Sequence, residues 1–416
     1  MSKISYTDVF VPGGFPHYTY NPREKLRLEA KVRQATENLC KLIPVTGHTK
    51  SGKTVLVRKV LPREDALWID GGGVGAEDDF WNVVIDQLEL FQTTESETSK
   101  GRSSQLSVGA KAGANLIVAK GEAQGSATIS SSQGSRSRTA RTVSSKVTAL
   151  AGLRKSKLPV VVDDFHYLPR GLQGELIRAL KPLIFDGLPV VIIAIPHRRY
   201  DALKVEKEMT GRILPVEIPL WEEQELRYIA DIGFKELGIK IPDAIIEILP
   251  RQAIGSPHLM QEFCRAIGRI HEEALHNFTL TKSLMDAVFT DTADTIGRPI
   301  FEKLARGPRQ RADRIPRLLK NGQKVDIYSL VLYALAHIKP GLATLEYEDL
   351  RTAIRDVSAD KIPQLQEVAR VLKHMSEIAA TDQSSTPVID FSDADKQLHV
   401  TDPFFAFYLR WGRMLS

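Results

Sequence analysis

The sequence predicts an α/β protein in which a parallel-sheet core is followed by a helical region and a small mixed domain. Short apolar runs alternate with amphipathic helical patterns through residues 1–220, as they do in parallel α/β sheets. Strand patterns then stop, and only two return, near the C-terminus. The length of 416 residues also favours more than one domain.

The bulk composition excludes several classes of protein. With 43% hydrophobic and 26% charged residues, the chain fits neither a disordered nor a fibrous protein. Its two cysteines, Cys40 and Cys264, lie far apart and match no zinc or disulfide pattern, so we expect a reducing, cytoplasmic environment. The N-terminus lacks a secretion signal, and no apolar run reaches the roughly 18 residues of a membrane span, which predicts no membrane partner.

The elements of the core are identified from their apolar patterns. A helix over roughly 22–42 is expected before a buried strand that ends in a glycine loop at residue 47. Continuous apolar runs predict further buried strands, and amphipathic runs predict the helices that cover them. The strands are expected at 66–70, 158–164 and 188–196, and the helices at 56–61, 78–91 and 171–185.

Residues 93–146 interrupt this alternation. The segment contains eight basic residues and three acidic ones, and up to residue 145 it has thirteen serines and neither proline nor aromatic residues. Its excess of five positive charges equals the formal charge of the whole chain, +5. We expect a solvated loop. An alternating run at 108–118 leaves open a β-hairpin that binds a partner protein, or a loop that contacts DNA.

Helical patterns dominate the rest of the chain. After the core at 1–220 we predict a helical lid at 221–305, a basic linker at 306–324 and a winged-helix domain at 325–416. The last domain combines three helical patterns with two short strand patterns, which is the composition of a winged helix. Five aromatic residues near its end are too densely spaced to be all exposed, so we expect a core role rather than base stacking. They are Phe404, Phe405, Phe407, Tyr408 and Trp411.

A phosphate-binding pattern lies between the first predicted strand and the helix after it. Residues 47–54, GHTKSGKT, match Gly-x4-Gly-Lys-Thr in the required context. Glycines allow backbone N–H groups to turn toward phosphates, and the helix N-terminus adds partial positive charge. In this pattern Lys53 reaches the β and γ phosphate oxygens, and the Thr54 hydroxyl binds Mg²⁺. We therefore expect ATP or ADP to contact Gly47, His48, Thr49, Lys50, Ser51, Gly52, Lys53, Thr54 and Val55.

Two carboxylates follow a predicted core strand. Asp163 and Asp164 end the run VVVDD, at the carboxyl edge of the sheet where open α/β sheets bind ligands. Asp163 fits the shell of Mg²⁺. Asp164 is then the candidate to orient or deprotonate the attacking water, because phosphoryl transfer depends mainly on positioning and charge neutralisation. A helix-capping or supporting role for Asp164 is the alternative.

Together these motifs resemble those of the AAA+ and STAND ATPases. The resemblance rests on GHTKSGKT, on VVVDD, on the apolar strand followed by residues 197–199, and on the GSP sequence at 255–257. It implies ATP as ligand, Mg²⁺ as cofactor and homo-oligomers as the working state. It also implies that the opening segment, with Tyr18, Tyr20 and Arg23, flanks the adenine, and that Pro257 contacts the base.

The resemblance also directs attention to polar groups that read the γ-phosphate. The family carries a polar sensor at the end of the strand after VVVDD, where this chain has none, so His197, Arg198 or Arg199 would be the substitute. Arg212 precedes the final core strand, the position of an arginine finger that acts across a subunit boundary. A surface salt bridge is its alternative. The absence of an arginine beside GSP favours a STAND-like protein over a processive motor.

The sequence supports two hypotheses of function from different classes. The first is an ATP-hydrolysing switch that oligomerises to control an assembly, and the second is a DNA-binding loader or regulator that uses the winged helix and the linker. An ATP-binding scaffold without turnover is a third. The linker is equally compatible with a solvated segment or an interdomain contact. Its charged residues are Arg306, Arg309, Arg311, Arg314, Arg317, Lys320 and Lys324 against Asp313.

Overall fold

A five-stranded, all-parallel sheet forms the core of the protein. The computed structural model describes residues 4–37, 40–90, 93–99, 136–195, 209, 211–274, 279–308, 314–380, 387–393 and 395–414. The strands are ordered β2-β5-β6-β1-β7. Their bounds are β1 (Leu42–Gly47), β2 (Leu67–Asp70), β5 (Val160–Asp163), β6 (Val190–Ala194) and β7 (Val216–Ile218). The expected parallel α/β core is therefore confirmed.

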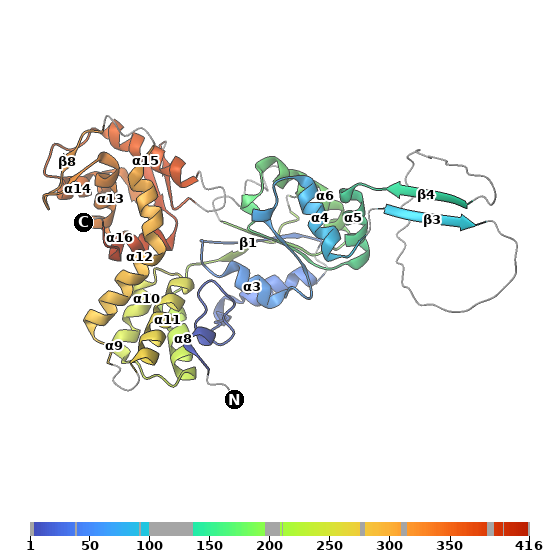
Figure 1. Cartoon of the computed structure of the whole chain (residues 1–416), viewed down its shortest axis with the longest axis horizontal. Coiled ribbons are helices and arrows are strands. Elements are labelled where there is room, and N and C mark those ends of the chain that lie inside the picture. The colour runs from blue at the N-terminus through green and yellow to red at the C-terminus, as the bar shows by residue number, and fades with distance from the viewer. Residues whose placement is uncertain are drawn as a thin grey trace.

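Helices cover both faces of this sheet, because its strands are apolar on both sides. Figure 1 shows α3 (Lys53–Val60) below the sheet and α4 (Glu77–Gln87), α5 (Ser145–Ser156) and α6 (Arg170–Phe185) above it. Side chains alternate between the two faces along a strand. Val160 packs in the cluster of α4, α5 and α6, whereas Val161 packs in the cluster of α3.

The segment before β1 differs from the helix expected at 22–42. It consists of three short pieces, η1 (Glu24–Leu26), α2 (Leu28–Arg33) and η2 (Gln34–Thr36), after an initial turn, α1 (Tyr6–Val9). Arg23, Arg27 and Cys40 adopt left-handed backbone angles, with φ of 49°, 52° and 52°. A single residue of this kind interrupts a right-handed helix. None of the three is a glycine, so the sequence gives no signal of the interruption.

Two strands bound the insertion. β3 (Thr93–Ser99) pairs antiparallel with β4 (Arg136–Thr142), with Thr93 opposite Thr142 and Ser99 opposite Arg136. In Figure 1 this ribbon extends away from the sheet, beyond α5. The two ends of the segment 93–146 are therefore paired strands and not loop. The alternating run at 108–118 lies outside the described residues.

The next part of the chain is helical, as expected for the lid. It contains α8 (Glu223–Glu236), α9 (Asp243–Ile246), α10 (Ile248–Gln252), α11 (Pro257–Glu273) and α12 (Lys282–Arg306). Within the described residues from 219 to 308 there is no strand. α12 continues through Pro299 to Arg306, so the first basic residue of the expected linker belongs to a helix.

The C-terminal part contains the helices and the hairpin expected at 325–416. The elements are β8 (Arg317–Leu318), β9 (Lys324–Val325), α13 (Ile327–Ile338), β10 (Thr344–Glu346), α14 (Tyr347–Val357), α15 (Leu365–Ala380), β11 (Ile389–Ser392), β12 (Gln397–Val400) and α16 (Pro403–Trp411). β10, β12 and β11 form an antiparallel sheet in that order. The division into domains, and the name winged helix, stay predictions.

The aromatic end of the chain lies in the core, as the sequence predicts for it. Phe405, Phe407 and Tyr408 are buried on α16, while Phe404 and Trp411 are half-buried. Phe407 packs 5.0 Å from Phe263 of α11, measured between ring centroids. Side chains of the lid, of the C-terminal part and of the N-terminal turn belong to one apolar cluster.

Two arginines of the predicted linker are held by the C-terminal part. Arg314 forms an ion pair with Asp326 and lies 4.4 Å from the ring centre of Tyr328. Arg317 forms an ion pair with Glu367 of α15 at 3.4 Å. Their side chains are only 12% and 13% exposed. For these two residues the structure favours an intramolecular contact over a free basic stripe.

The described helices include none that is both long and apolar enough to cross a membrane.

Truncation of Phe407 tests the shared apolar cluster. We expect Phe407→Ala to lower the free energy of unfolding of the lid and C-terminal part by about 3–5 kcal/mol, because a fully buried ring leaves a cavity. Phe185→Ala is the matched control, since this ring is 59% exposed and its loss should change stability by less than about 0.5 kcal/mol. Urea denaturation followed by circular dichroism measures both. Equal effects of the two variants would contradict the assignment.

Candidate nucleotide site

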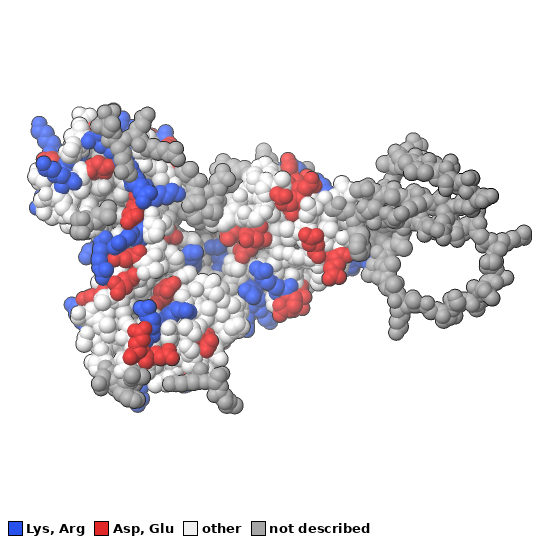
Figure 2. All heavy atoms as spheres, in the orientation of Figure 1, with Lys and Arg blue, Asp and Glu red and all other residues white. Residues whose placement is uncertain are grey.

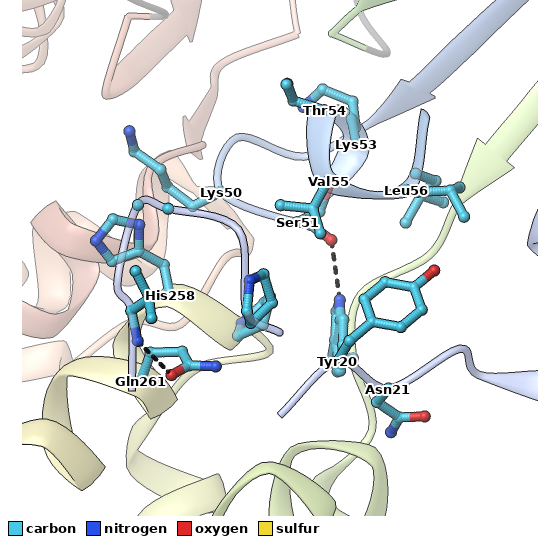
Figure 3. A pocket seen from close by; sticks show the side chains of 18 of the residues that line it. Tyr20, Asn21, Lys50, Ser51, Lys53, Thr54, Val55, Leu56, His258 and Gln261 are labelled. Atoms are coloured by element: carbon cyan, nitrogen blue, oxygen red, sulfur yellow. Dashed lines mark hydrogen bonds between the residues drawn. The ribbon is translucent and has the colours of Figure 1, made fainter. Parts of the chain in front are cut away.

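A cavity of about 280 Å³ lies where the P-loop, the N-terminal segment and the lid meet. The P-loop is here residues 47–54, which join β1 to α3. Figure 3 shows Lys50, Ser51, Lys53 and Thr54 on one side of the cavity and His258 and Gln261 on the lid side. Of the residues predicted to bind nucleotide, those that line it are Thr49, Lys50, Ser51, Gly52, Lys53, Thr54, Val55, Tyr20, Pro257 and Asp164.

The P-loop backbone depends on its two glycines. A Cβ atom on Gly47 would lie 2.9 Å from the carbonyl oxygen of Ile218 and 2.9 Å from Ser51 Oγ, so a side chain does not fit there. Gly52 has a φ of 89°, which strains any other residue. α3 starts directly after it, at Lys53. The N-terminus of α3 is thereby directed at the cavity, with its partial positive charge.

The Lys53 side chain is hydrogen-bonded to the backbone of the P-loop. Its Nζ donates hydrogen bonds to the carbonyl oxygens of Gly47, at 3.0 Å, and His48, at 2.8 Å. Burial lowers the pKa of Lys53 to about 8, and Asp164 and Asp163 oppose this shift. A polyphosphate would supply the negative charge that such a buried ammonium lacks. Gly47 and His48 thus support the lysine from outside the cavity lining.

Three carboxylates meet at the ends of neighbouring strands. Asp70 ends β2 and Asp163 ends β5, paired with each other in the parallel register, and Asp164 follows in a left-handed conformation, φ 50°. Burial, followed by the charge of Asp164, raises the pKa of Asp163 to about 6. Burial also raises the pKa of Asp164, while Lys53 opposes the rise. The negative charges of these carboxylates are therefore costly, and a cation at this edge of the sheet would reduce that cost.

The residues present fit Mg²⁺ and a phosphate group. Thr54 Oγ1 donates to Asp163 Oδ1 at 3.1 Å, which brings together a hydroxyl and a carboxylate, the oxygen ligands that Mg²⁺ prefers. Ser51 Oγ is buried in the P-loop without a hydrogen-bond partner among the described residues. An orphaned buried hydroxyl of this kind is expected where a bound group supplies the partner.

The opposite end of the cavity is aromatic and apolar. Tyr20 stacks on Phe15 with ring centroids 6.5 Å apart, and burial with a hydrogen bond to Glu29 raises its pKa. The GSP sequence is a helix-capping turn. Ser256 caps α11, and Pro257 occupies the first turn of that helix, at the cavity. Tyr20 and Pro257 therefore line the same cavity, and their contact with a base stays a prediction.

Arg23 departs from the role expected for it. It is absent from the cavity lining, and its side chain is 3% exposed. It forms an ion pair with Glu225 at 2.7 Å, and its guanidinium donates to the carbonyl oxygens of Pro219 and Leu220. These partners hold the guanidinium outside the cavity lining. Tyr18 is likewise absent from the lining and 41% exposed.

Arg212 is absent from the lining of this cavity. The Arg212 guanidinium lies 4.9 Å from the ring centre of Phe185. Among the described residues it forms no ion pair, so the surface salt bridge that was the alternative is not observed there. Its role as an arginine finger needs a second copy and stays a prediction. His197, Arg198 and Arg199 lie outside the described residues.

Sequence reasoning missed three residues that shape the site. Asp70 ends an apolar strand just as Asp163 does, a signal that was present in the run ALWID. Gln261 accepts a hydrogen bond from the Val11 N–H at 3.1 Å and donates to Thr19 at 2.7 Å, and so fixes the N-terminal wall. Trp221 donates to the P-loop. The last two had no signal, because their partners lie far away in the sequence.

The C-terminal part also reaches the P-loop. Lys50 Nζ lies 5.5 Å from the ring centre of Phe404, at the start of α16, and the His258 ring packs against the same ring at 4.8 Å. A second cavity, of about 330 Å³, separates the P-loop from the C-terminal sheet. Its polar lining comes from His48 and Thr49 on one side and from Thr344, Asp390, His399 and Thr401 on the other.

Comparison with solved structures identifies the fold. No protein-family model and no curated protein matches the sequence. A Walker-type ATPase of Pyrococcus abyssi superposes with a TM-score of 0.52 at 15% identity, covering 94% of this chain and 95% of that one. The ORC2 protein of Aeropyrum pernix, solved as ADPNP–ADP complexes, gives 0.48 at 13% identity, over 96% and 95%. The likeness to the first of these shows the fold that the motifs predict, an α/β P-loop core with a helical lid.

Neutralising Asp163 tests the electrostatics of the site. Its folded-state pKa of about 6 exceeds the ordinary 3.8, so its ionisation costs stability as the pH rises through that interval. Asp163→Asn removes this cost. We expect the melting temperature of the variant, relative to wild type, to rise between about pH 4 and about pH 6 and then to level off. Asp186→Asn, at an exposed carboxylate, is the control. A pH-independent difference in differential scanning fluorimetry would contradict the burial of Asp163.

Proposed function

We propose that the protein is an ATP-binding, Mg²⁺-dependent ATP-hydrolysing switch. The observation that carries this proposal is the convergence of Lys53, Thr54, Asp163 and Asp164 at the carboxyl ends of β1 and β5. The buried ammonium of Lys53 and the half-buried carboxylates influence each other's charge there, and phosphates with a divalent cation would satisfy both. The likeness to a protein named as a Walker-type ATPase adds support from the fold.

Each group has a chemical role in this proposal. Lys53 and the loop N–H groups bind the β and γ phosphates, and the base lies between Tyr20 and Pro257. Thr54 and Asp163 would hold Mg²⁺, whose charge neutralises the phosphate oxygens. Asp164 lines the cavity, where it orients or deprotonates the water that attacks the γ phosphorus, and ADP with phosphate leaves.

The contact between α16 and the P-loop supports the switch. Phe404 touches Lys50 of the loop and His258 of the lid, and both of these residues line the cavity. A polyphosphate would attract the Lys50 ammonium away from the aromatic ring. Nucleotide would thereby change how the C-terminal part sits on the core, and hydrolysis would reset it.

Oligomerisation is the proposed output. Arg212 and the 59% exposed ring of Phe185 lie together at the end of α6. An exposed aromatic ring that stacks on an arginine is a suitable contact for a second copy of the chain. In such an assembly Arg212 would complete the phosphate site of its neighbour.

Two substitutions separate binding from turnover. We expect Lys53→Ala to weaken ATP binding by about 10- to 100-fold, since it removes charge-assisted hydrogen bonds. Asp164→Asn should bind ATP with nearly wild-type affinity but lose about 10²- to 10⁴-fold in turnover, because the group acts on water. Calorimetry, a coupled ATPase assay and light scattering with ATP measure binding, turnover and assembly. Lys155→Ala, an exposed lysine of α5, is the control. Wild-type protein that binds no ATP would refute the proposal.

A DNA-binding regulator is the second candidate. It rests on the predicted winged helix, whose elements would be α13, α14, α15 and the β11–β12 hairpin. Of these, α15 exposes Arg370 and Lys373. Against it, Arg314 and Arg317 are occupied by carboxylates. On the face shown in Figure 2, basic side chains are interspersed with acidic ones and no broad basic area is visible.

Salt dependence decides this second candidate. If α15 holds duplex DNA, the double variant Arg370→Ala/Lys373→Ala should flatten the slope of log affinity against log salt by about 2, because each of the two side chains would neutralise one phosphate. Fluorescence anisotropy of a labelled duplex measures this slope. Wild-type protein without salt-dependent binding, or a double variant with an unchanged slope, would exclude α15 as the DNA-binding helix.

A further inference from the structure

Trp221 connects the lid to the P-loop. It lies between β7 and α8, in the short link through which the chain passes from core to lid. Its indole Nε1 donates a hydrogen bond to the carbonyl oxygen of Ser51 at 2.9 Å. Its own backbone N–H donates to the carbonyl oxygen of Gly255 at 3.3 Å. One residue therefore contacts both the phosphate loop and the turn that carries Pro257.

The hydrogen bond to Ser51 fixes a peptide plane of the P-loop. In a trans peptide the carbonyl of one residue and the N–H of the next point in opposite directions, and the described peptides include no cis bond. Holding the Ser51 carbonyl against the indole therefore turns the Gly52 N–H away from it. That N–H has no hydrogen-bond partner among the described residues. It is left available as a donor to a ligand.

The Arg23 guanidinium stacks on the Trp221 indole and fixes its position. The Arg23 guanidinium lies 4.8 Å from the Trp221 ring centre, and its own partners are the carbonyls of Pro219 and Leu220 and the Glu225 carboxylate. A buried guanidinium with this many partners is rigid and presents a flat face for stacking. The link and the N-terminal segment thus fix the ring on which the Ser51 carbonyl depends.

We propose that Trp221 is a positioning residue that makes phosphate affinity depend on the lid. With the indole in place, the Gly52 N–H is preset for the β phosphate. A lid movement that withdraws the indole frees the Ser51–Gly52 peptide to rotate and weakens the grip on the phosphates. This inference rests on the proposed ATP binding. It also gives Arg23 a function, since that residue supports the indole and lies outside the cavity.

The test is Trp221→Phe, which keeps an aromatic wall and removes the N–H donor. We expect affinity for ADP and ATP to fall by about 2- to 10-fold, the net effect of one hydrogen bond. Affinity for AMP, which has no β phosphate, should be unchanged. Competition against a fluorescent ADP analogue measures all three nucleotides. Thermal unfolding without nucleotide checks that the variant folds, and Arg23→Lys should show the same pattern more weakly.

The matched control is Trp411→Phe. Trp411 also donates from its indole, to Gln252 Oε1 at 2.8 Å, but at the contact between α16 and the lid. We expect its loss to leave all three affinities unchanged. Equal weakening of AMP, ADP and ATP in Trp221→Phe would make the ring a wall for the base only and overturn the proposal, as would wild-type affinities. If the wild-type protein itself fails to bind ATP and ADP, the proposed function falls together with this inference.

Discussion

The buried ammonium of Lys53 is the constraint to which the rest of the site conforms. It is held by the carbonyls of Gly47 and His48, so β1 has to end and α3 has to begin within a few residues of each other. Only a glycine at 47 leaves room for this approach. A buried cation also needs nearby negative charge, and Asp163 and Asp164 at the end of β5 provide part of it. The loop and the two carboxylates are therefore arranged around one buried charge.

The carboxylates explain why this edge of the sheet favours a cation. Asp70, Asp163 and Asp164 are brought together by parallel register, and burial makes the negative charges of Asp163 and Asp164 more costly. Lys53 offsets part of the charge, although burial lowers the pKa of its ammonium to about 8. A divalent cation with an anionic ligand satisfies both sets of groups simultaneously. The proposed Mg²⁺ and nucleotide would therefore reduce the electrostatic cost of these groups.

Much of the fold and of the phosphate end of the site follows from local sequence. The runs VVVDD and ALWID are apolar enough for strands buried on both faces, and GHTKSGKT carries its own glycines and lysine. The lid contacts do not follow, because they join distant positions: Trp221 with Ser51, Gln261 with Val11, and Arg23 with Leu220. Nor do the left-handed Arg27 and Cys40, where tertiary packing imposes a conformation that their side chains disfavour.

The apolar cluster shared by the lid, the C-terminal part and the N-terminal turn has a mechanical consequence. Val9 and Phe10 are buried in that cluster, and after them the chain returns to the sheet core. The link at 219–221 connects the core to the lid a second time. Two separate connections restrict relative motion of the two bodies more than one connection would, and least about the line that joins them. A displacement about that line would be largest at the far end of the C-terminal helices.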